Sequence, residues 1–199
     1  GEGEEQMIEV MELYKTHKKS NYSKKEFLLE AARTIEGIYI PSFYEVSYNV
    51  DNTINAVVPL YKKIPLTIKK RIIKDMDSVF FPEKLMVPNI EVVHGRIILE
   101  IFRGCTRGCR FCQAGMIYRP VRERSVEKLL ELADSTFKST GYEEMSLSSL
   151  SSSDHSKLGE LLDELNEKHS SNMTSISLPS LRLDNFSVEM AEKVQKVKK

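Results

Sequence analysis

The sequence lacks an excess of charge of either sign, because its 29 lysines and arginines are balanced by 29 aspartates and glutamates. This balance argues against wholesale binding to nucleic acid or to an anionic membrane. A run of about 18 apolar residues, which a membrane-spanning helix needs, is also missing from the chain. So is an amino-terminal signal peptide. We therefore expect a protein with a cytoplasmic location and no membrane partner.

Cysteine is scarce, and its distribution is uneven. The three cysteines of the 199-residue chain, Cys105, Cys109 and Cys112, lie within eight residues. An odd number of thiols in a chain expected in the cytoplasm argues against a disulfide framework. Free structural thiols remain an alternative, but thiols clustered in this way more often bind metal or take part in redox chemistry.

The amino-terminal part of the chain, residues 1–85, mixes helical and strand patterns. Apolar residues recur at helical spacing over 1–19, and Ser23 with Glu26 fits a capping box that begins a second helix. The further elements predicted from the pattern are a hairpin over 38–61, a short basic helix over 66–76 and a second hairpin over 90–102.

From about residue 96 the predicted elements alternate as βαβαβα, an order that builds a parallel sheet with helices outside it. The predicted strands cover 96–102, 143–150 and 174–178, and the predicted helices cover 125–141, 157–169 and 188–199. Three such units do not close a barrel, so this part is interpreted as the first half of a (β/α) barrel or as an open sheet. Because the chain begins with Gly1 rather than Met and stops within a predicted helix, we expect it to be an internal fragment of a longer protein.

The cysteines follow the first strand of this series in a C-x3-C-x2-C run. Sites in parallel α/β folds lie at the carboxyl ends of strands, and soft thiolates suit iron–sulfur clusters and zinc. Gly104 and Gly108 allow tight turns, so one loop can present three thiolates to a cubane cluster whose fourth iron stays open. Arg103, Arg107 and Arg110 are expected to offset the negative charge of that cluster.

Other interpretations of this region stay open. Three cysteines with His94 or His155 would form a zinc site, although zinc loops usually contain two separate C-x2-C pairs. Arg119, Arg122 and Arg124 form a basic group that suits a phosphate-bearing substrate, a nucleic acid or ion pairs within the domain. The alternative function is therefore a zinc-stabilised binding module that contacts RNA.

The string EIFRGCTRGCRFCQAGMIYRP at residues 100–120 resembles the cluster loop of the radical S-adenosylmethionine (SAM) superfamily. That signature has three cysteines at this spacing and an aromatic residue, here Phe111, before the third. The continuation RPVRER resembles a bacterial branch of iron–sulfur oxidoreductases in which a cobalamin-binding domain precedes the barrel. The opening GEGE resembles the run just after that domain.

The resemblance implies an α/β fold, the first half (three βα units) of a partial (β/α)6 barrel over 86–199, after a helical and hairpin linker over 1–85. It also implies a [4Fe-4S] cluster on Cys105, Cys109 and Cys112, bound SAM and, in the full-length protein, cobalamin. The implied parent enzyme reductively cleaves SAM to a 5′-deoxyadenosyl radical, with an unknown substrate and an electron donor as partners. Half a barrel leaves apolar faces exposed, so we expect the isolated fragment to be inactive and to self-associate.

The resemblance also marks candidate contacts to SAM. Related proteins hold the methionine amine with a Gly-Gly-Glu-like segment after the second strand, where this chain has a serine-rich run that is alternatively a flexible loop. Residues after the third strand contact cofactor or substrate in related barrels, although an ordinary strand end with a surface salt bridge is the alternative there. The candidate residues are Phe111, Ser148, Ser149, Leu150, Ser151, Asp154, Ser180 and Arg182.

Overall fold

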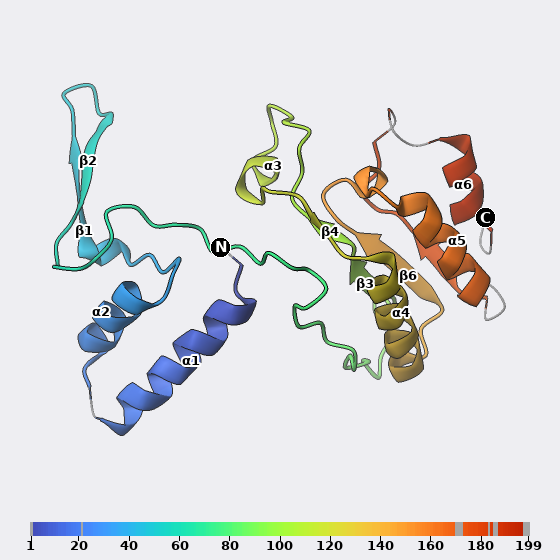
Figure 1. Cartoon of the computed structure of the whole chain (residues 1–199), viewed down its shortest axis with the longest axis horizontal. Helices are drawn as coiled ribbons and strands as arrows, with labels where there is room; N and C mark the ends of the chain where they lie inside the picture. Colours follow the sequence, from blue (N-terminus) through green and yellow to red (C-terminus); the bar gives the residue numbers. More distant parts are fainter. Residues whose placement is uncertain (1, 21, 170–172, 183, 185–186, 197–199) are drawn as a thin grey trace. The chain divides into compact units, whose positions relative to one another are not determined.

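The computed structural model describes residues 2–20, 22–169, 173–182, 184 and 187–196 (Figure 1). The chain forms two compact units, Gly1–Ile73 and Lys74–Lys199. In the described part of the chain, no helix combines the length and the apolar character that crossing a membrane requires.

The first unit begins with two helices, α1 (Glu4–Lys19) and α2 (Lys24–Thr34). The capping box predicted at the start of α2 is confirmed. The Glu26 backbone amide donates to Ser23 Oγ at 3.3 Å, and the Ser23 backbone amide donates to Glu26 Oε2 at 2.8 Å. These two bonds satisfy amides that have no partner within the helix.

A hairpin follows, as the alternating pattern predicted. After the 3-10 turn η1 (Pro41–Phe43), strand β1 (Tyr44–Tyr48) pairs antiparallel with β2 (Ile54–Pro59). Phe43 and the first residue of β1 are buried in a small core with Ala32 and Ile64. The base of the hairpin is therefore anchored by apolar burial.

The predicted helix over 66–76 is wrong, because this segment, which the structure describes throughout, is irregular and extended. Its backbone bonds to the start of the chain instead, through the Glu2 amide and the Arg71 carbonyl at 3.2 Å. The Arg71 guanidinium also binds the carboxylates of Glu5 and Glu9 in α1, each at 2.8 Å. Contacts with a distant element have replaced local helical hydrogen bonds.

The second unit contains a three-stranded parallel sheet in the order β3-β6-β7. The α/β class and the parallel βαβαβα order are thus confirmed. The second predicted hairpin is wrong: residues 90–93, all described, form no strand, and β3 pairs with β6 instead. The elements are β3 (Ile97–Glu100), α4 (Val126–Thr140), β6 (Glu144–Ser148), α5 (Leu158–His169), β7 (Ser175–Ser177) and α6 (Val188–Val194).

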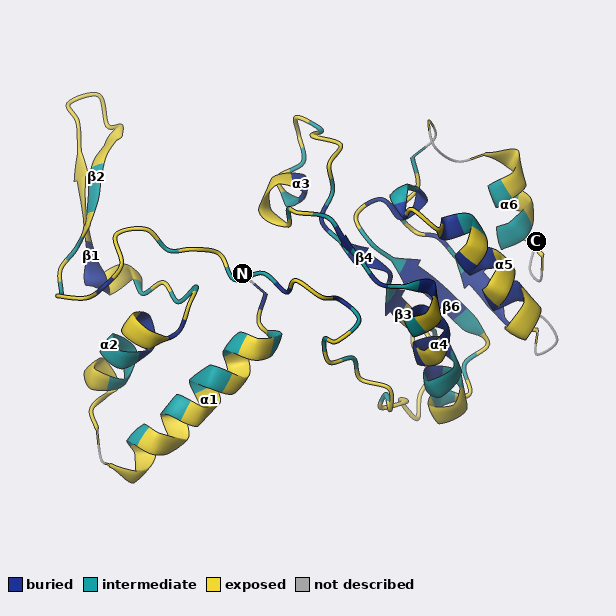
Figure 2. Ribbon diagram, in the orientation of Figure 1, coloured by how far each residue is buried: buried dark blue, intermediate teal, exposed yellow. Residues whose placement is uncertain are grey.

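One face of this sheet packs against α4 and α5. The strands succeed one another in the sheet in chain order, so right-handed crossovers place both helices on the same face, as Figure 1 shows. Figure 2 shows the buried residues of the strands and helices meeting there. The most deeply buried members of this core are Ile97, Leu99, Leu129, Leu132, Met145, Leu147, Leu161, Leu162 and Leu165.

The ends of α4 follow the sequence signals. Ser125 Oγ accepts the amide of Lys128 at 3.1 Å, and Gly141 ends the helix in the left-handed region at φ 69°. The Ser125 amide in turn donates to Asp77 Oδ1 at 2.9 Å. The segment before β3 is therefore fastened to α4, in keeping with its place in the second unit.

Replacing Leu161 with alanine should lower the free energy of unfolding by about 2–5 kcal/mol, because a fully buried leucine leaves a cavity between sheet and helix. Glu164→Ala, on the exposed side of the same helix, is the matched control and should change stability by less than about 0.5 kcal/mol. Denaturant unfolding followed by circular dichroism measures both. Equal effects of the two substitutions would contradict this description of the core.

Candidate functional site

The cysteines lie in a loop that is closed at its base. Beyond β3 the chain forms β4 (Phe102–Arg103), which pairs antiparallel with β5 (Arg122–Glu123) and so encloses residues 104–121. The amide of Ile101 donates to the carbonyl of Ser148 at 3.0 Å. The loop therefore starts beside the carboxyl end of β6, at the edge of the sheet where sites in parallel folds lie.

Gly104 is the tightest point of this base. It has a positive φ of 91°, and a Cβ added there would lie 2.5 Å from the Pro120 carbonyl oxygen and 2.8 Å from that of Tyr118. Arg122 binds the same two carbonyls, with Nε 3.1 Å from Pro120 O and Nη2 3.3 Å from Tyr118 O. A residue without a side chain is therefore required where the chain enters the loop.

The three cysteines occupy irregular backbone and are partly buried. A Cβ placed on Gly115, in the short helix α3 (Ala114–Ile117), would lie 4.0 Å from both Cys105 Cβ and Cys112 Sγ. The amide of Cys112 donates to the carbonyl of Cys109 at 3.0 Å in a turn. Cys105 and Cys112 thus both lie beside Gly115, and Cys109 and Cys112 share a turn. Among the described residues, however, no three His, Cys, Asp or Glu side chains are gathered closely enough to hold a metal ion as they stand.

The arginine that reaches a thiol is not one of the three in the cysteine run. Arg182 Nη1 lies 3.6 Å from Cys109 Sγ, across 73 residues of sequence. Arg103 instead binds both carboxylate oxygens of Glu100, each at 2.8 Å. Arg107 binds Asp154 with two donors, one of which is 2.8 Å from Oδ2, and this bond raises the pKa of the arginine. The thiol of Cys105 also contributes to the raised pKa of Arg107, so the expectation that the arginines of this run offset negative charge at the thiols stays a prediction.

The basic group after the cysteines is engaged with the protein itself. Arg119 Nε donates to the Cys105 carbonyl at 3.1 Å. Arg122 binds the carbonyls at the loop base, and Arg124, which is 2% exposed, lies 5.4 Å from the centre of the Phe81 ring. These contacts support the alternative in which the group serves the domain internally.

The serine-rich run after β6 folds compactly. Ser152 is fully buried in the 3-10 turn η2 (Ser152–Asp154), and its hydroxyl donates to the Leu147 carbonyl at 3.0 Å. Ser149 Oγ lies 3.0 Å from Ser152 Oγ. Ser151 is 2% exposed, and its Oγ has no hydrogen-bond partner within the described part of the chain.

The loop after β7 contacts both other loops. The Ser180 carbonyl accepts the amide of Ser152 at 2.7 Å. The Arg182 guanidinium, which also touches Cys109, binds Asp184 at 3.0 and 2.8 Å and lowers the pKa of that carboxyl group. The structure therefore brings together the cysteines, Ser148–Ser151, Asp154, Ser180 and Arg182. Two of the predicted contact residues are exposed to solvent: the exposed fraction is 92% for Phe111 and 40% for Leu150.

Neither histidine considered for zinc points to a shared site with the thiols. His155 is buried, with Nε2 3.2 Å from the Arg124 carbonyl and Nδ1 3.2 Å from the Lys157 amide. His94 Nδ1 lies 2.7 Å from Arg96 Nη2. The zinc alternative is therefore not favoured.

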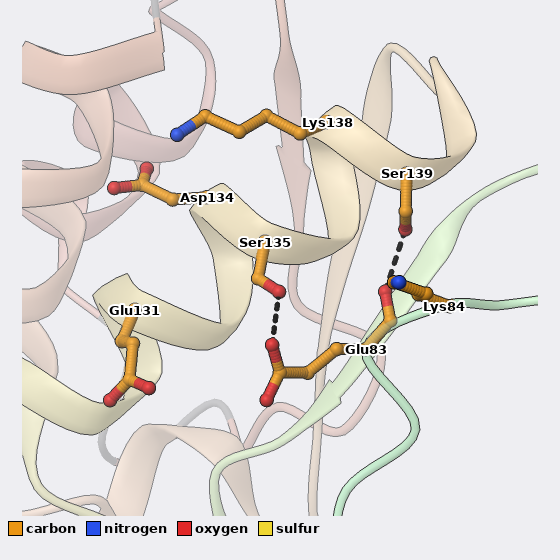
Figure 3. Close-up of a pocket in the computed structure, with 7 residues that line it drawn as sticks. All are labelled: Glu83, Lys84, Glu131, Asp134, Ser135, Lys138 and Ser139. Atoms are coloured by element: carbon orange, nitrogen blue, oxygen red, sulfur yellow. Dashed lines mark hydrogen bonds between the residues drawn. The ribbon is translucent and has the colours of Figure 1, made fainter.

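A surface pocket of about 620 Å³ lies away from the cysteines, on the outer side of α4 (Figure 3). Its lining is charged and hydroxylic, and Figure 3 shows Ser135 and Ser139 reaching toward Glu83. Ser139 Oγ donates to the Glu83 carbonyl at 2.6 Å, and Ser135 Oγ donates to its carboxylate. The contacts fasten the segment before β3 to α4, so we attribute this pocket to packing rather than to chemistry.

The residues present fit an iron–sulfur cluster with SAM. Three soft thiols on one irregular loop are the donor set that such a cluster takes. Gly115 lies beside two of these cysteines, and the Ser151 hydroxyl in the neighbouring loop is buried without a hydrogen-bond partner among the described residues. The fold and site together define an α/β protein with a cysteine loop at the carboxyl edge of a parallel sheet.

The family follows from comparison with known proteins. A family model described as the Radical SAM superfamily matches residues 99–199, half of the chain. The chain belongs to this superfamily, and its membership supports an enzyme. It is also similar to a protein of Methanocaldococcus jannaschii named as uncharacterized, with 31% identity over 126 residues. That match covers 59% of this chain and 28% of the relative, so the chain spans less than a third of the relative's length.

Gly104→Ala should loosen the cysteine loop, because its Cβ would overlap two backbone carbonyls. Gly108→Ala is the matched control: its φ is also positive, at 66°, but its nearest atom is the Arg119 side chain at 3.6 Å. Each substitution costs about 1–2 kcal/mol because alanine disfavours a left-handed backbone. Gly104→Ala also suffers the steric overlap with the two carbonyls. We expect faster iodoacetamide alkylation of the three thiols in Gly104→Ala than in Gly108→Ala, measured by peptide mass spectrometry. Equal rates would contradict the closed base.

Proposed function

We propose that this chain belongs to an enzyme that holds a [4Fe-4S] cluster on Cys105, Cys109 and Cys112 and uses it with SAM. The observation that carries the proposal is the placement of three thiols, on one irregular loop, beside the carboxyl ends of parallel strands. When bound, a reduced cluster supplies one electron that cleaves SAM into methionine and a 5′-deoxyadenosyl radical, which takes a hydrogen atom from the substrate. The electron donor and the substrate are partners of the whole protein.

The chain's own residues would orient and shield this chemistry. We propose that SAM lies against the loops after β6 and β7, with Ser148, Ser149, Leu150 and Ser151 near its methionine part. The buried hydroxyl of Ser151 supports this, since an unpaired buried polar group gains most from a ligand. Ser180 and Arg182 belong to the same surface, because Ser180 bonds to the loop after β6 and Arg182 contacts the cysteine loop. Phe111 is exposed and suits a contact that forms only with ligand or with the rest of the protein.

We further propose that the three βα units are the first half of a partial (β/α)6 barrel. Two features support this: the strands lie in chain order, and the helices α4 and α5 share one face. An open doubly wound sheet reverses its strand order and has helices on both faces. On the other face, Ile98, Ser146 and Ser177 form one cross-strand row, which would line the barrel interior. The linker role of residues 1–85 and a preceding cobalamin domain stay predictions.

Anaerobic reconstitution with iron and sulfide should load about four of each per chain. Replacing any one of Cys105, Cys109 and Cys112 with alanine should reduce this loading severely, because the loop then offers two thiols to the cluster. His94→Ala is the control and should load like the unmodified chain. Metal and sulfide analysis measures the outcome, and stoichiometric zinc without sulfide would instead support the binding-module alternative.

Ser151→Ala should weaken SAM binding by about three- to tenfold, the value of one neutral hydrogen bond. It should leave the free energy of unfolding unchanged or raised, because the hydroxyl is buried without a partner. Ser152→Ala is the matched control: it should lower the free energy of unfolding by about 1 kcal/mol, since its hydroxyl bonds to Leu147. Anaerobic calorimetric titration of the reconstituted chain measures affinity. Unaltered affinity in Ser151→Ala would remove this residue from the proposed site.

A further inference from the structure

The middle of the cysteine loop is joined to the loop after β6 by one ion pair. Arg107 Nε lies 2.8 Å from Asp154 Oδ2, and Arg107 Nη2 binds Oδ1, across 47 residues of sequence. A two-pronged arginine–carboxylate contact fixes orientation as well as distance. Arg107 stands between Cys105 and Cys109, so this contact fixes the stretch that separates two of the thiols.

The two partners differ in how firmly their backbones are held. Asp154 ends the 3-10 turn η2, its amide donates to the Ser151 carbonyl at 2.8 Å, and the neighbouring Ser152 is fully buried. Arg107 lies in irregular, exposed backbone. The turn η2 is therefore the better-ordered partner, and its ion pair with Arg107 restrains the cysteine loop.

We propose that Arg107 and Asp154 are positioning residues that hold the cysteine loop against the loop after β6, ready to receive the cluster. Asp154 then acts through Arg107 rather than by contacting SAM directly, as the resemblance to the superfamily implied. This inference rests on the proposed function of the site. In the loop after β6, the polar contacts to SAM are then made by the serines that precede Asp154.

The test compares Arg107→Ala, Asp154→Asn and the exchange Arg107→Asp with Asp154→Arg in the full chain. Lys128→Ala is the matched control, because it removes a partly exposed ion pair with Glu131 in α4, outside the cysteine loop. The first readout is iodoacetamide alkylation of each cysteine in the cluster-free chain, resolved by peptide mass spectrometry. The second is iron and sulfide per chain after reconstitution, and the third is SAM affinity of the loaded chain.

We expect Arg107→Ala and Asp154→Asn to accelerate alkylation equally, by up to about fivefold, as for the loss of a partly exposed ion pair. Both should lower cluster loading to the same degree, and the charge exchange should restore much of it. Lys128→Ala should behave like the unmodified chain in all three readouts. Circular dichroism confirms that each variant is folded, and the isosteric Asp154→Asn limits the risk of misfolding.

Two results would overturn the inference. If Arg107→Ala matches the unmodified chain while Asp154→Asn loses SAM affinity, the carboxylate acts on the ligand directly. If neither substitution changes the alkylation rate or the cluster loading, the Arg107–Asp154 ion pair does not position the cysteine loop. Failure of the unmodified chain to load a cluster counts against the proposed function, whereas the alkylation comparison in the cluster-free chain still decides on the pair.

Discussion

The loop that carries the thiols depends on one close approach of backbone to backbone. Gly104 passes so near the carbonyls of Tyr118 and Pro120 that a methyl group would overlap both. The short β4–β5 ladder and the Arg122 guanidinium complete this closure. Because the two ends of the loop are pinned together, the chain between them can stay irregular without losing its place at the edge of the sheet. That constraint places the two ends of the stretch that carries the thiols.

The parallel topology then brings distant residues to the same edge. The strands β3, β6 and β7 all end there, so the loops that follow them meet although they are separated by long helical crossovers. Their contacts are polar: Ser152 with Ser180, and Arg182 with Cys109. Arg182 thus brings a positive charge to within 3.6 Å of the Cys109 sulfur from outside the motif.

Local signals predicted the local structure well. The capping box at Ser23, the cap at Ser125 and the apolar periodicity of α4 each depend on residues within a few positions, and each is confirmed. The parallel sheet followed from the order of such elements. The predictions for 66–76 and 90–102 were wrong because distant contacts determine the structure there. Arg71 binds α1, and β3 pairs with β6. Local propensity gives no information about either contact. Likewise, the motif located the cysteines, but no spacing rule reveals which arginine reaches them.

Stability and positioning lie in different parts of the second unit. The apolar core between the sheet and its helices holds the fully buried leucines, so the free energy of folding comes largely from there. The cysteine loop is held instead by Gly104, by Arg119 on the Cys105 carbonyl and by partly exposed ion pairs. Such pairs contribute little to stability yet fix direction through their geometry. A loop built in this way is oriented by polar contacts of stated geometry rather than by apolar packing.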